Sequence, residues 1–180
     1  MTAKLIGLHS SAIVLMFAAA TYPARSDDLI TTRRLSAALA AEAVTEAVAT
    51  CAKRGSHVSA AIVNIDGRTQ AILRGDGASE TSFEIASDKA YTVVMLGATR
   101  NEDSISAIVG RMSSNPTASW GSGNVGGLAK LSHVSLIPGG LRIKIGNEII
   151  GGIGVGGTPD IDGDEVCAKA GLDKISAHLK

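Results

Sequence analysis

The dipeptide Asp66-Gly67 constrains the fold of this chain more than any other feature, because it separates two short apolar segments. Residues 58–65 read VSAAIVNI, and residues 69–74 read TQAILR. Both segments have the length and the β-branched content that are typical of strands. Asp-Gly is a preferred pair for a two-residue hairpin turn, in which both residues take a positive φ. The sequence therefore predicts a β-hairpin with two antiparallel strands.

The rest of the chain alternates between helical and strand patterns. Segments whose apolar side chains recur at the helical period are predicted helices: 29–54, 79–100, 103–112 and a last one from about residue 162. Short apolar segments bounded by Gly and Pro are predicted strands: one or two pieces in 128–137, then 141–145 and 148–155. We therefore expect an α+β domain in which helices pack on an antiparallel sheet, with the first and last helices side by side.

The N-terminal segment has the layout of a secretory signal peptide. Lys4 gives a positive start, residues 13–20 are apolar, and Ala24-Arg25-Ser26 forms a cleavage site of small residues. The alternative, an uncleaved membrane anchor, needs a longer apolar run of about 20 residues. We therefore predict a signal peptide at 1–26, one domain at 27–180, and a periplasmic or secreted protein without stable membrane insertion after cleavage.

The composition limits the core and the partners. The chain has 17 basic and 17 acidic residues and is 45% hydrophobic but only 3% aromatic. Its core is therefore built mainly from Val, Ile, Leu and Ala. The balanced charge provides no basic surface, so nucleic acid is not expected as a partner.

The two cysteines, Cys51 and Cys167, form a candidate disulfide. An even number of cysteines in an exported chain favours a bridge. The alternative is a pair of buried free thiols. Neither residue belongs to a C-x-x-C pair, so zinc, iron–sulfur and thioredoxin-like sites are not expected.

Two motifs near the C-terminus have both a functional and a structural interpretation. Residues 152–157 fit G-x-G-x-x-G, but a dinucleotide site also needs a helix that opens directly after the motif. A glycine-rich strand that allows close approach of another backbone is the simpler interpretation. Asp160, Asp162 and Asp164 alternate like early calcium ligands, but without the Gly and Glu of the calcium loop. An acidic helix start with a capping box is therefore favoured.

Arg74, Asp76 and Lys89 form a candidate anion site around the start of the second predicted helix. A guanidinium, a helix N-terminus and an ammonium group are typical partners of a phosphate, carboxylate or haem propionate. The structural alternative is a capping and ion-pair cluster that fixes the turn between strand and helix.

Histidine provides the candidate metal ligands. His57 precedes a predicted strand, and His133 begins one. Both are interpreted first as polar residues at the edge of the sheet. If iron is bound axially, His133 and His57 are the candidates, because imidazole is a common haem ligand.

Several segments, in this order and spacing, resemble the GlcG/HbpS-like haem-binding family. They are AIV-x-x-DG at 61–67, R-x-DGA at 74–78, A-x-x-KA at 86–90, PGG at 138–140, GNEIIGGIGVGG at 146–157 and A-x-AGL at 168–172. The resemblance covers nearly the whole mature domain. It departs at 141–143, where many relatives have a second Pro, and in the Gly/Ser-rich loop 117–127, which carries Trp120.

The resemblance implies a profilin-like sandwich with a five-stranded antiparallel sheet, and homo-oligomers of up to eight subunits. It implies haem as a cofactor and no shared set of catalytic residues, so a non-enzymatic haem- or small-ligand-binding protein is expected. In this hypothesis the Gly-rich strand and the loop 117–127 contact the porphyrin. The alternatives are an accessory protein or enzyme that acts on a small organic acid such as glycolate, and a partner-binding module for a sensor.

Overall fold

The computed structural model describes residues 29–115, 125–128, 130–160 and 162–180. The chain divides into two compact units, residues 1–31 and 32–180. Of the first unit, only residues 29–31 are described, and they are exposed and form neither helix nor strand. The predicted signal peptide therefore lies outside the described residues. None of the described helices combines the length and the hydropathy that a membrane span requires.

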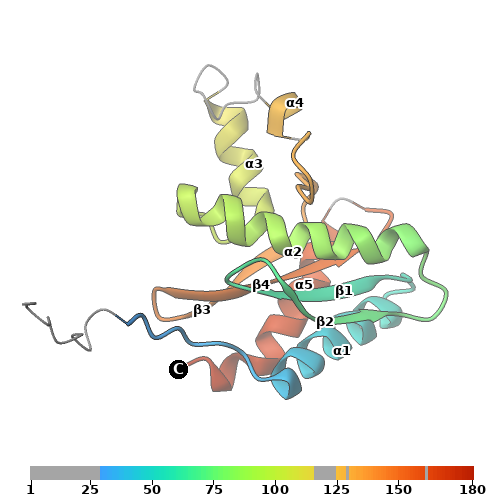
Figure 1. Ribbon diagram of the computed structural model, residues 1–180. Helices are drawn as coiled ribbons and strands as arrows, with labels where there is room; N and C mark the ends of the chain where they lie inside the picture. Colours follow the sequence, from blue (N-terminus) through green and yellow to red (C-terminus); the bar gives the residue numbers. More distant parts are fainter. Residues whose placement is uncertain (1–28, 116–124, 129, 161) are drawn as a thin grey trace, which may run out of the picture. The chain divides into compact units, whose positions relative to one another are not determined.

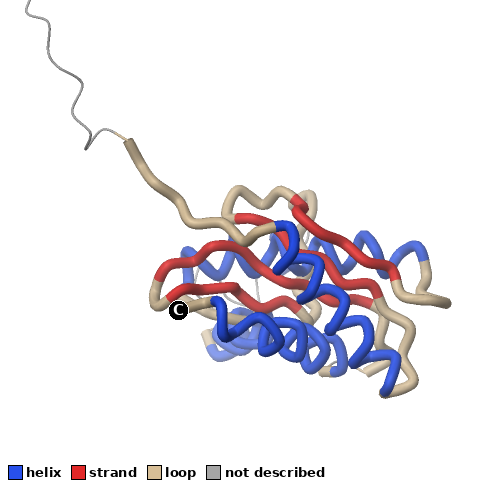
Figure 2. Tube along the Cα trace, turned by 90° about the horizontal axis from the view of Figure 1, so that it is seen from below, coloured by secondary structure: helices blue, strands red, loops and turns tan. Residues whose placement is uncertain are grey.

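The second unit is an antiparallel sheet covered on both faces by helices. In chain order its described elements are α1 (Ala37–Lys53), β1 (Ser59–Asn64), β2 (Thr69–Arg74), α2 (Glu80–Arg100), α3 (Ile105–Ser114), α4 (Val125–Leu128), β3 (Gly140–Ile145), β4 (Glu148–Gly156), α5 (Gly163–Ile175) and the 3-10 helix η3 (Ser176–His178). The strand order is β2-β1-β4-β3, and every pair is antiparallel. Helix α2 covers one face, and α1 and α5 lie side by side on the other (Figures 1 and 2). The predicted α+β class is confirmed.

Each face of the sheet has its own apolar core. The larger core lies under α1 and α5, and the smaller one lies under α2. Successive side chains of a strand point to opposite faces. Thus Ala60 and Ile62 of β1 pack toward α1 and α5, whereas Val63 packs against Val93 and Val94 of α2. The continuous apolar pattern of β1 reflects burial on both sides.

The predicted hairpin is confirmed, but the first helix begins later than expected. Strands β1 and β2 pair around the turn, and Gly67 has a φ of 74°. Helix α1 starts at Ala37, not at residue 29, because the Ser36 side chain accepts a hydrogen bond from the Leu39 amide at 3.2 Å. Such an N-cap satisfies a backbone donor that would otherwise lack a partner.

The described residues of 128–137 form no strand, so the one or two strand pieces predicted there are wrong, and the described part of the chain contains four strands, not the expected five. The backbone of this segment bonds to α2 in place of a neighbouring strand. The Ser135 amide donates to the Thr92 hydroxyl at 2.8 Å. His133 has a φ of 64°, which is incompatible with a strand.

The disulfide between Cys51 and Cys167 is confirmed. It joins α1 to α5, with the two Cα atoms 5.6 Å apart, and both side chains are fully buried. The alternative of two free thiols is therefore wrong. The bridge fixes the pair of helices that covers the larger core.

Replacing both cysteines with alanine is expected to lower the free energy of unfolding by about 2–5 kcal/mol. The bridge links positions 116 residues apart, so its removal increases the freedom of the unfolded chain. Urea unfolding of the oxidised wild type and of the Cys51→Ala/Cys167→Ala variant measures the difference. Dithiothreitol should lower the midpoint of the wild type and leave that of the variant unchanged. Equal stability of the oxidised wild type and the variant would contradict this prediction.

The glycines of β4 bring this strand close to α2. A Cβ atom at Gly152 would lie 2.8 Å from the Ala90 carbonyl oxygen, and one at Gly154 would overlap the backbone of Ala86 and Ala90. Antiparallel neighbours flank β4, and α5 starts only at Gly163. The glycine-rich strand is therefore confirmed, and the structure does not have the strand-to-helix turn of a dinucleotide site.

Candidate ligand site between the hairpin and helix α2

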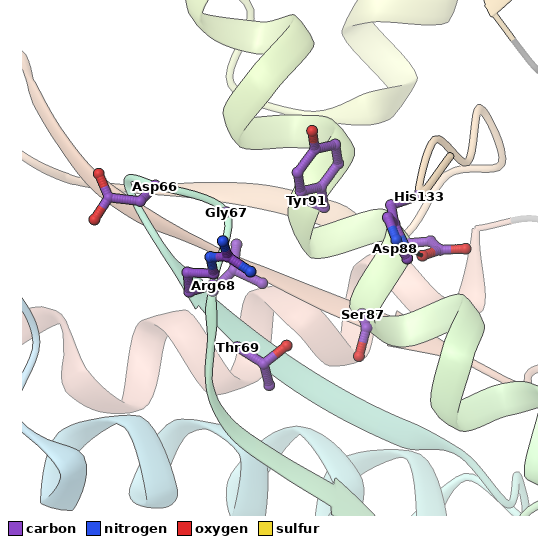
Figure 3. Close-up of a pocket in the computed structure, with 9 residues that line it drawn as sticks. Asp66, Gly67, Arg68, Thr69, Ser87, Asp88, Tyr91 and His133 are labelled. Carbon is purple, nitrogen blue, oxygen red and sulfur yellow. Dashed lines mark hydrogen bonds and ion pairs between the residues drawn. The ribbon is translucent and has the colours of Figure 1, made fainter. Parts of the chain in front are cut away.

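A cavity of about 490 Å³ lies between the hairpin turn and the middle of α2. We call it the hairpin–α2 cavity. Its lining residues are Val63, Asp66, Gly67, Arg68, Thr69, Ser87, Asp88, Tyr91 and His133. Figure 3 shows that they come from the hairpin, from α2 and from the segment that carries His133. Ligand pockets usually have volumes of about 300–1,000 Å³, so this one has the size of a small-molecule or cofactor site.

The hairpin turn is held in place from two sides. The Asn64 side-chain oxygen accepts hydrogen bonds from the amides of Asp66 and Arg68, at 3.0 and 2.9 Å. Gly67 lies against the ring of Tyr91, where a Cβ atom would come within 2.7 Å. The position of Arg68 relative to α2 is therefore fixed by packing at the turn as well as by hydrogen bonds.

His133 lies at the rim of the hairpin–α2 cavity, next to Asp88. Its Nδ1 lies 3.2 Å from Asp88 Oδ1, and its ring meets the ring of Tyr91 edge-on at 6.0 Å between centroids. The side chain is 72% exposed. Among the described residues, Nε2 of His133 has no hydrogen-bond partner. An imidazole with one nitrogen engaged and the other open is the usual arrangement of a metal ligand.

Arg68 is the cation of this cavity. Asp66 beside it is already paired with Arg34 at 3.0 Å. In the part of the chain that the structure describes, no ion pair or hydrogen bond engages the Arg68 guanidinium. A guanidinium in this state can bind a carboxylate through two parallel hydrogen bonds.

The structure does not bring the predicted cluster of Arg74, Asp76 and Lys89 together. Arg74 is exposed and lies 3.9 Å from Glu80. The backbone carbonyl of Asp76 accepts a hydrogen bond of 2.6 Å from Nδ1 of His57. Lys89 lies on the buried face of α2, where its Nζ bonds to Asp164 at 2.6 Å. Lys89 is therefore not available to a ligand at the surface.

His57 is exposed, and it does not line the hairpin–α2 cavity. Its ring packs on the turn at Gly77. The two predicted axial candidates thus have different surroundings, and His133 is the one that lines a cavity. The predicted porphyrin loop with Trp120 lies largely outside the described residues.

The acidic segment before α5 has a structural role. Asp164 accepts hydrogen bonds from Lys89 and, at 3.0 Å, from the Thr158 amide. Asp162 occupies the N-cap position without a side-chain capping bond. The predicted capping box is therefore wrong, because the Asp162 side chain makes no capping bond and the carboxylate of Glu165, three residues later, accepts a hydrogen bond from the Ser106 hydroxyl. Within the described ranges, no group of three His, Cys, Asp or Glu side chains is arranged to hold a metal ion.

A second cavity, of about 430 Å³, lies at the outer edge of β3, but its cations are already engaged. Asp103 accepts a hydrogen bond from Arg142 Nε at 2.9 Å and another from Lys144 Nζ at 2.5 Å. Burial alone would raise the pKa of Asp103, but hydrogen bonds from Lys144 and Arg142 and the positive charges of both leave this pKa below the ordinary 3.8. The ionised Asp103 thus competes with any outside anion for these cations.

Sequence reasoning missed Arg68, Asp88 and Tyr91 as site residues. The sequence contained one signal for two of them, the spacing of polar residues along the second predicted helix. Ser87, Asp88 and Tyr91 have the three- and four-residue spacing that places polar side chains on one face of a helix. The partner of that face could not be identified, because His133 lies 45 residues from Asp88 in the sequence.

Comparison with known proteins identifies relatives of the chain. The model of a family described as haem degrading protein HbpS-like matches residues 35–173. A double mutant of HbpS from Streptomyces reticuli is 31% identical and has a TM-score of 0.70, with 87% of this chain and 97% of that chain covered. No curated protein matches the sequence.

Two more distant structures have the same fold. The Klebsiella pneumoniae protein ORFY, of family DUF336, has a TM-score of 0.70 at 21% identity, with 86% of this chain and 99% of that chain covered. A complex of PduOC with haem has a TM-score of 0.65 at 22% identity, with 79% and 96% covered. These likenesses extend over almost the full length of both structures.

Proposed function

This chain belongs to the HbpS-like haem-degrading family, and on that premise we propose that it is an exported haem-binding protein whose site is the hairpin–α2 cavity. HbpS is about one-third identical over nearly all of its length. PduOC, which has the same fold, was solved with haem. Both relatives favour haem over other small ligands. The residues of the cavity must then fit that cofactor.

The cavity residues fit the three parts of a haem molecule. The open Nε2 of His133 would bind the iron. The ring of Tyr91 provides surface for the porphyrin. The guanidinium of Arg68 suits a propionate. Haem, when bound, would supply an iron centre for ligand binding or electron transfer.

One observation carries this proposal: His133 and Arg68 lie at the same cavity. The alternative candidates are less suitable. His57 is bonded to the Asp76 carbonyl outside the cavity, and Lys89 is buried with Asp164. A site for a small organic acid was expected around Arg74 and Lys89. The burial of Lys89 removes one of the cations on which that alternative depended.

Haem titration of the purified domain is expected to give a saturable Soret shift that His133→Ala abolishes. Loss of the imidazole removes the proposed iron ligand. His57→Ala is the matched control, because it removes an exposed histidine outside the cavity, and it should bind haem like the wild type. Arg68→Gln should weaken binding by roughly tenfold or more, since a charged hydrogen bond contributes about 1.5–3 kcal/mol.

Metal-free protoporphyrin IX distinguishes the proposed contact of His133 with the iron from that of Arg68 with a propionate. Its binding, measured by fluorescence, should depend on Arg68 and much less on His133, because it contains no iron. A wild-type protein that shows no Soret shift at micromolar haem would refute the proposed function. Equal effects of His133→Ala and His57→Ala would refute the proposed site.

We also propose that the domain works in the periplasm or outside the cell, as a homo-oligomer. The disulfide supports export, because such bonds persist mainly in oxidising compartments. The mass of the mature protein recovered from a bacterial periplasm tests the cleavage after Ser26. Light scattering of the purified protein tests the oligomer.

A further inference from the structure

We infer that Asp88 is a positioning residue that makes the hairpin–α2 cavity selective for ferric over ferrous haem. This inference rests on the proposed function. It concerns the oxidation state of the haem iron, which the overall fold does not determine. The argument starts from the pair that Asp88 forms with His133.

Helix α2 holds His133 at two points one turn apart. The Asp88 carboxylate lies 3.2 Å from Nδ1 of the ring. The Thr92 hydroxyl accepts from the Ser135 amide at 2.8 Å and lies 3.4 Å from the His133 carbonyl oxygen. The positive φ of His133 turns the chain at this point. Both the backbone and the ring of His133 are therefore placed by a rigid helix.

The Asp88 contact also selects the tautomer of the ring. A carboxylate oxygen can only accept a hydrogen bond, so Nδ1 of His133 must carry the proton. The lone pair of the neutral ring is then on Nε2, which has no partner among the described residues. Asp88 thus presents His133 in the form that can bind iron.

A carboxylate that accepts a hydrogen bond from Nδ1 also changes how strongly the imidazole binds a metal through Nε2. It raises the basicity of the ring, so the ring donates more electron density through Nε2. Ferric iron has one more positive charge than ferrous iron and gains more from an electron-rich ligand and from a nearby anion. The hydrogen bonds of an axial ligand are one of the means by which a protein sets a haem potential. Asp88 should therefore favour the ferric state.

The first test uses the haem-free protein. NMR of ring ¹⁵N nuclei should show the His133 ring as the Nδ1-protonated tautomer in the wild type. Asp88→Ala should shift the ring toward the mixture found in a free histidine. A merely structural role of Asp88 would not move this readout. An unchanged tautomer in Asp88→Ala overturns the inference.

The second test compares the two oxidation states. Asp88→Asn keeps the size of the side chain and removes its charge. It should weaken ferric haem binding by roughly 10–100-fold, the usual cost of losing such a partner, and ferrous haem binding by clearly less. The reduction potential of the bound haem should rise, by about 59 mV for each tenfold difference between the two affinities.

Glu84→Gln is the matched control. It removes a negative charge four residues earlier on α2, from an exposed side chain that does not line the cavity. It should leave both affinities and the potential unchanged. If Asp88→Asn weakens ferric and ferrous binding equally, or if Glu84→Gln has the same effect as Asp88→Asn, the inference fails and the proposed function stands. If the wild type binds no haem, both fail.

Discussion

Lys89→Met is expected to lower the free energy of unfolding by about 3–5 kcal/mol, because it leaves the Asp164 carboxylate buried without its cation. The side chains of Lys89 and Asp164 are 1% and 6% exposed, and their charged atoms lie 2.6 Å apart. Methionine is close to lysine in length, so the loss of the pair dominates over the change in packing. Urea unfolding measures the effect.

The double variant Lys89→Met/Asp164→Asn should recover much of that loss. Asparagine has no charge, yet its side-chain oxygen can still accept the hydrogen bond from the Thr158 amide. Replacement of a buried ion pair by neutral residues of similar volume is often tolerated. With the Asp164→Asn single variant added, the double-mutant cycle gives the coupling energy of the pair.

Lys169→Met is the control for this experiment. Lys169 forms an ion pair with Asp173 at 2.7 Å, but both side chains are more than half exposed. Such a pair contributes at most about 1 kcal/mol. If Lys89→Met cost no more than Lys169→Met, the buried pair would not be a major contributor to the stability of this fold.

The elements that were predicted correctly depend on local signals. Helix α2 follows its Ser79 cap, and the hairpin follows Asp66-Gly67. The segment 128–137 was predicted wrongly, because its apolar residues resemble a strand while its backbone bonds to Thr92, 43 residues away from Ser135. A short apolar segment does not specify its partner, so periodicity alone could not distinguish these cases.

The candidate site was predictable in its residue types and not in its arrangement. His133 was a candidate ligand because of its chemistry, but the sequence placed it on a strand edge. Lys89 was expected to bind an anion together with Arg74, whereas its partner Asp164 lies 75 residues further along the chain. Pairings over such distances are determined by how the helices pack on the sheet. The disulfide was easier to anticipate, since two cysteines allow only one intramolecular pairing.

Gly154→Ala is expected to be among the most damaging single substitutions, with a loss of about 3 kcal/mol or more. Gly154 lies in the second half of β4, where its added Cβ would overlap the carbonyl oxygen of Ala86 and the amide nitrogen of Ala90. These are backbone atoms of α2, so no change of rotamer can relieve the contact. The helix would have to move away from the sheet, and the core around Val93 and Val94 would open.

Gly110→Ala is the matched control, because the same chemical change should have the opposite sign there. Gly110 is an exposed residue within α3, with nothing within 4 Å of an added Cβ. Alanine in a helix interior is favoured over glycine by about 0.5–1 kcal/mol, so this variant should be more stable than the wild type. Urea unfolding of both variants measures the two changes in the free energy of unfolding. A loss below about 0.5 kcal/mol for Gly154→Ala, which is typical of surface substitutions, would mean that β4 and α2 can separate freely. That result would contradict the close packing of α2 on the sheet, which holds Asp88 and Tyr91 at the hairpin–α2 cavity.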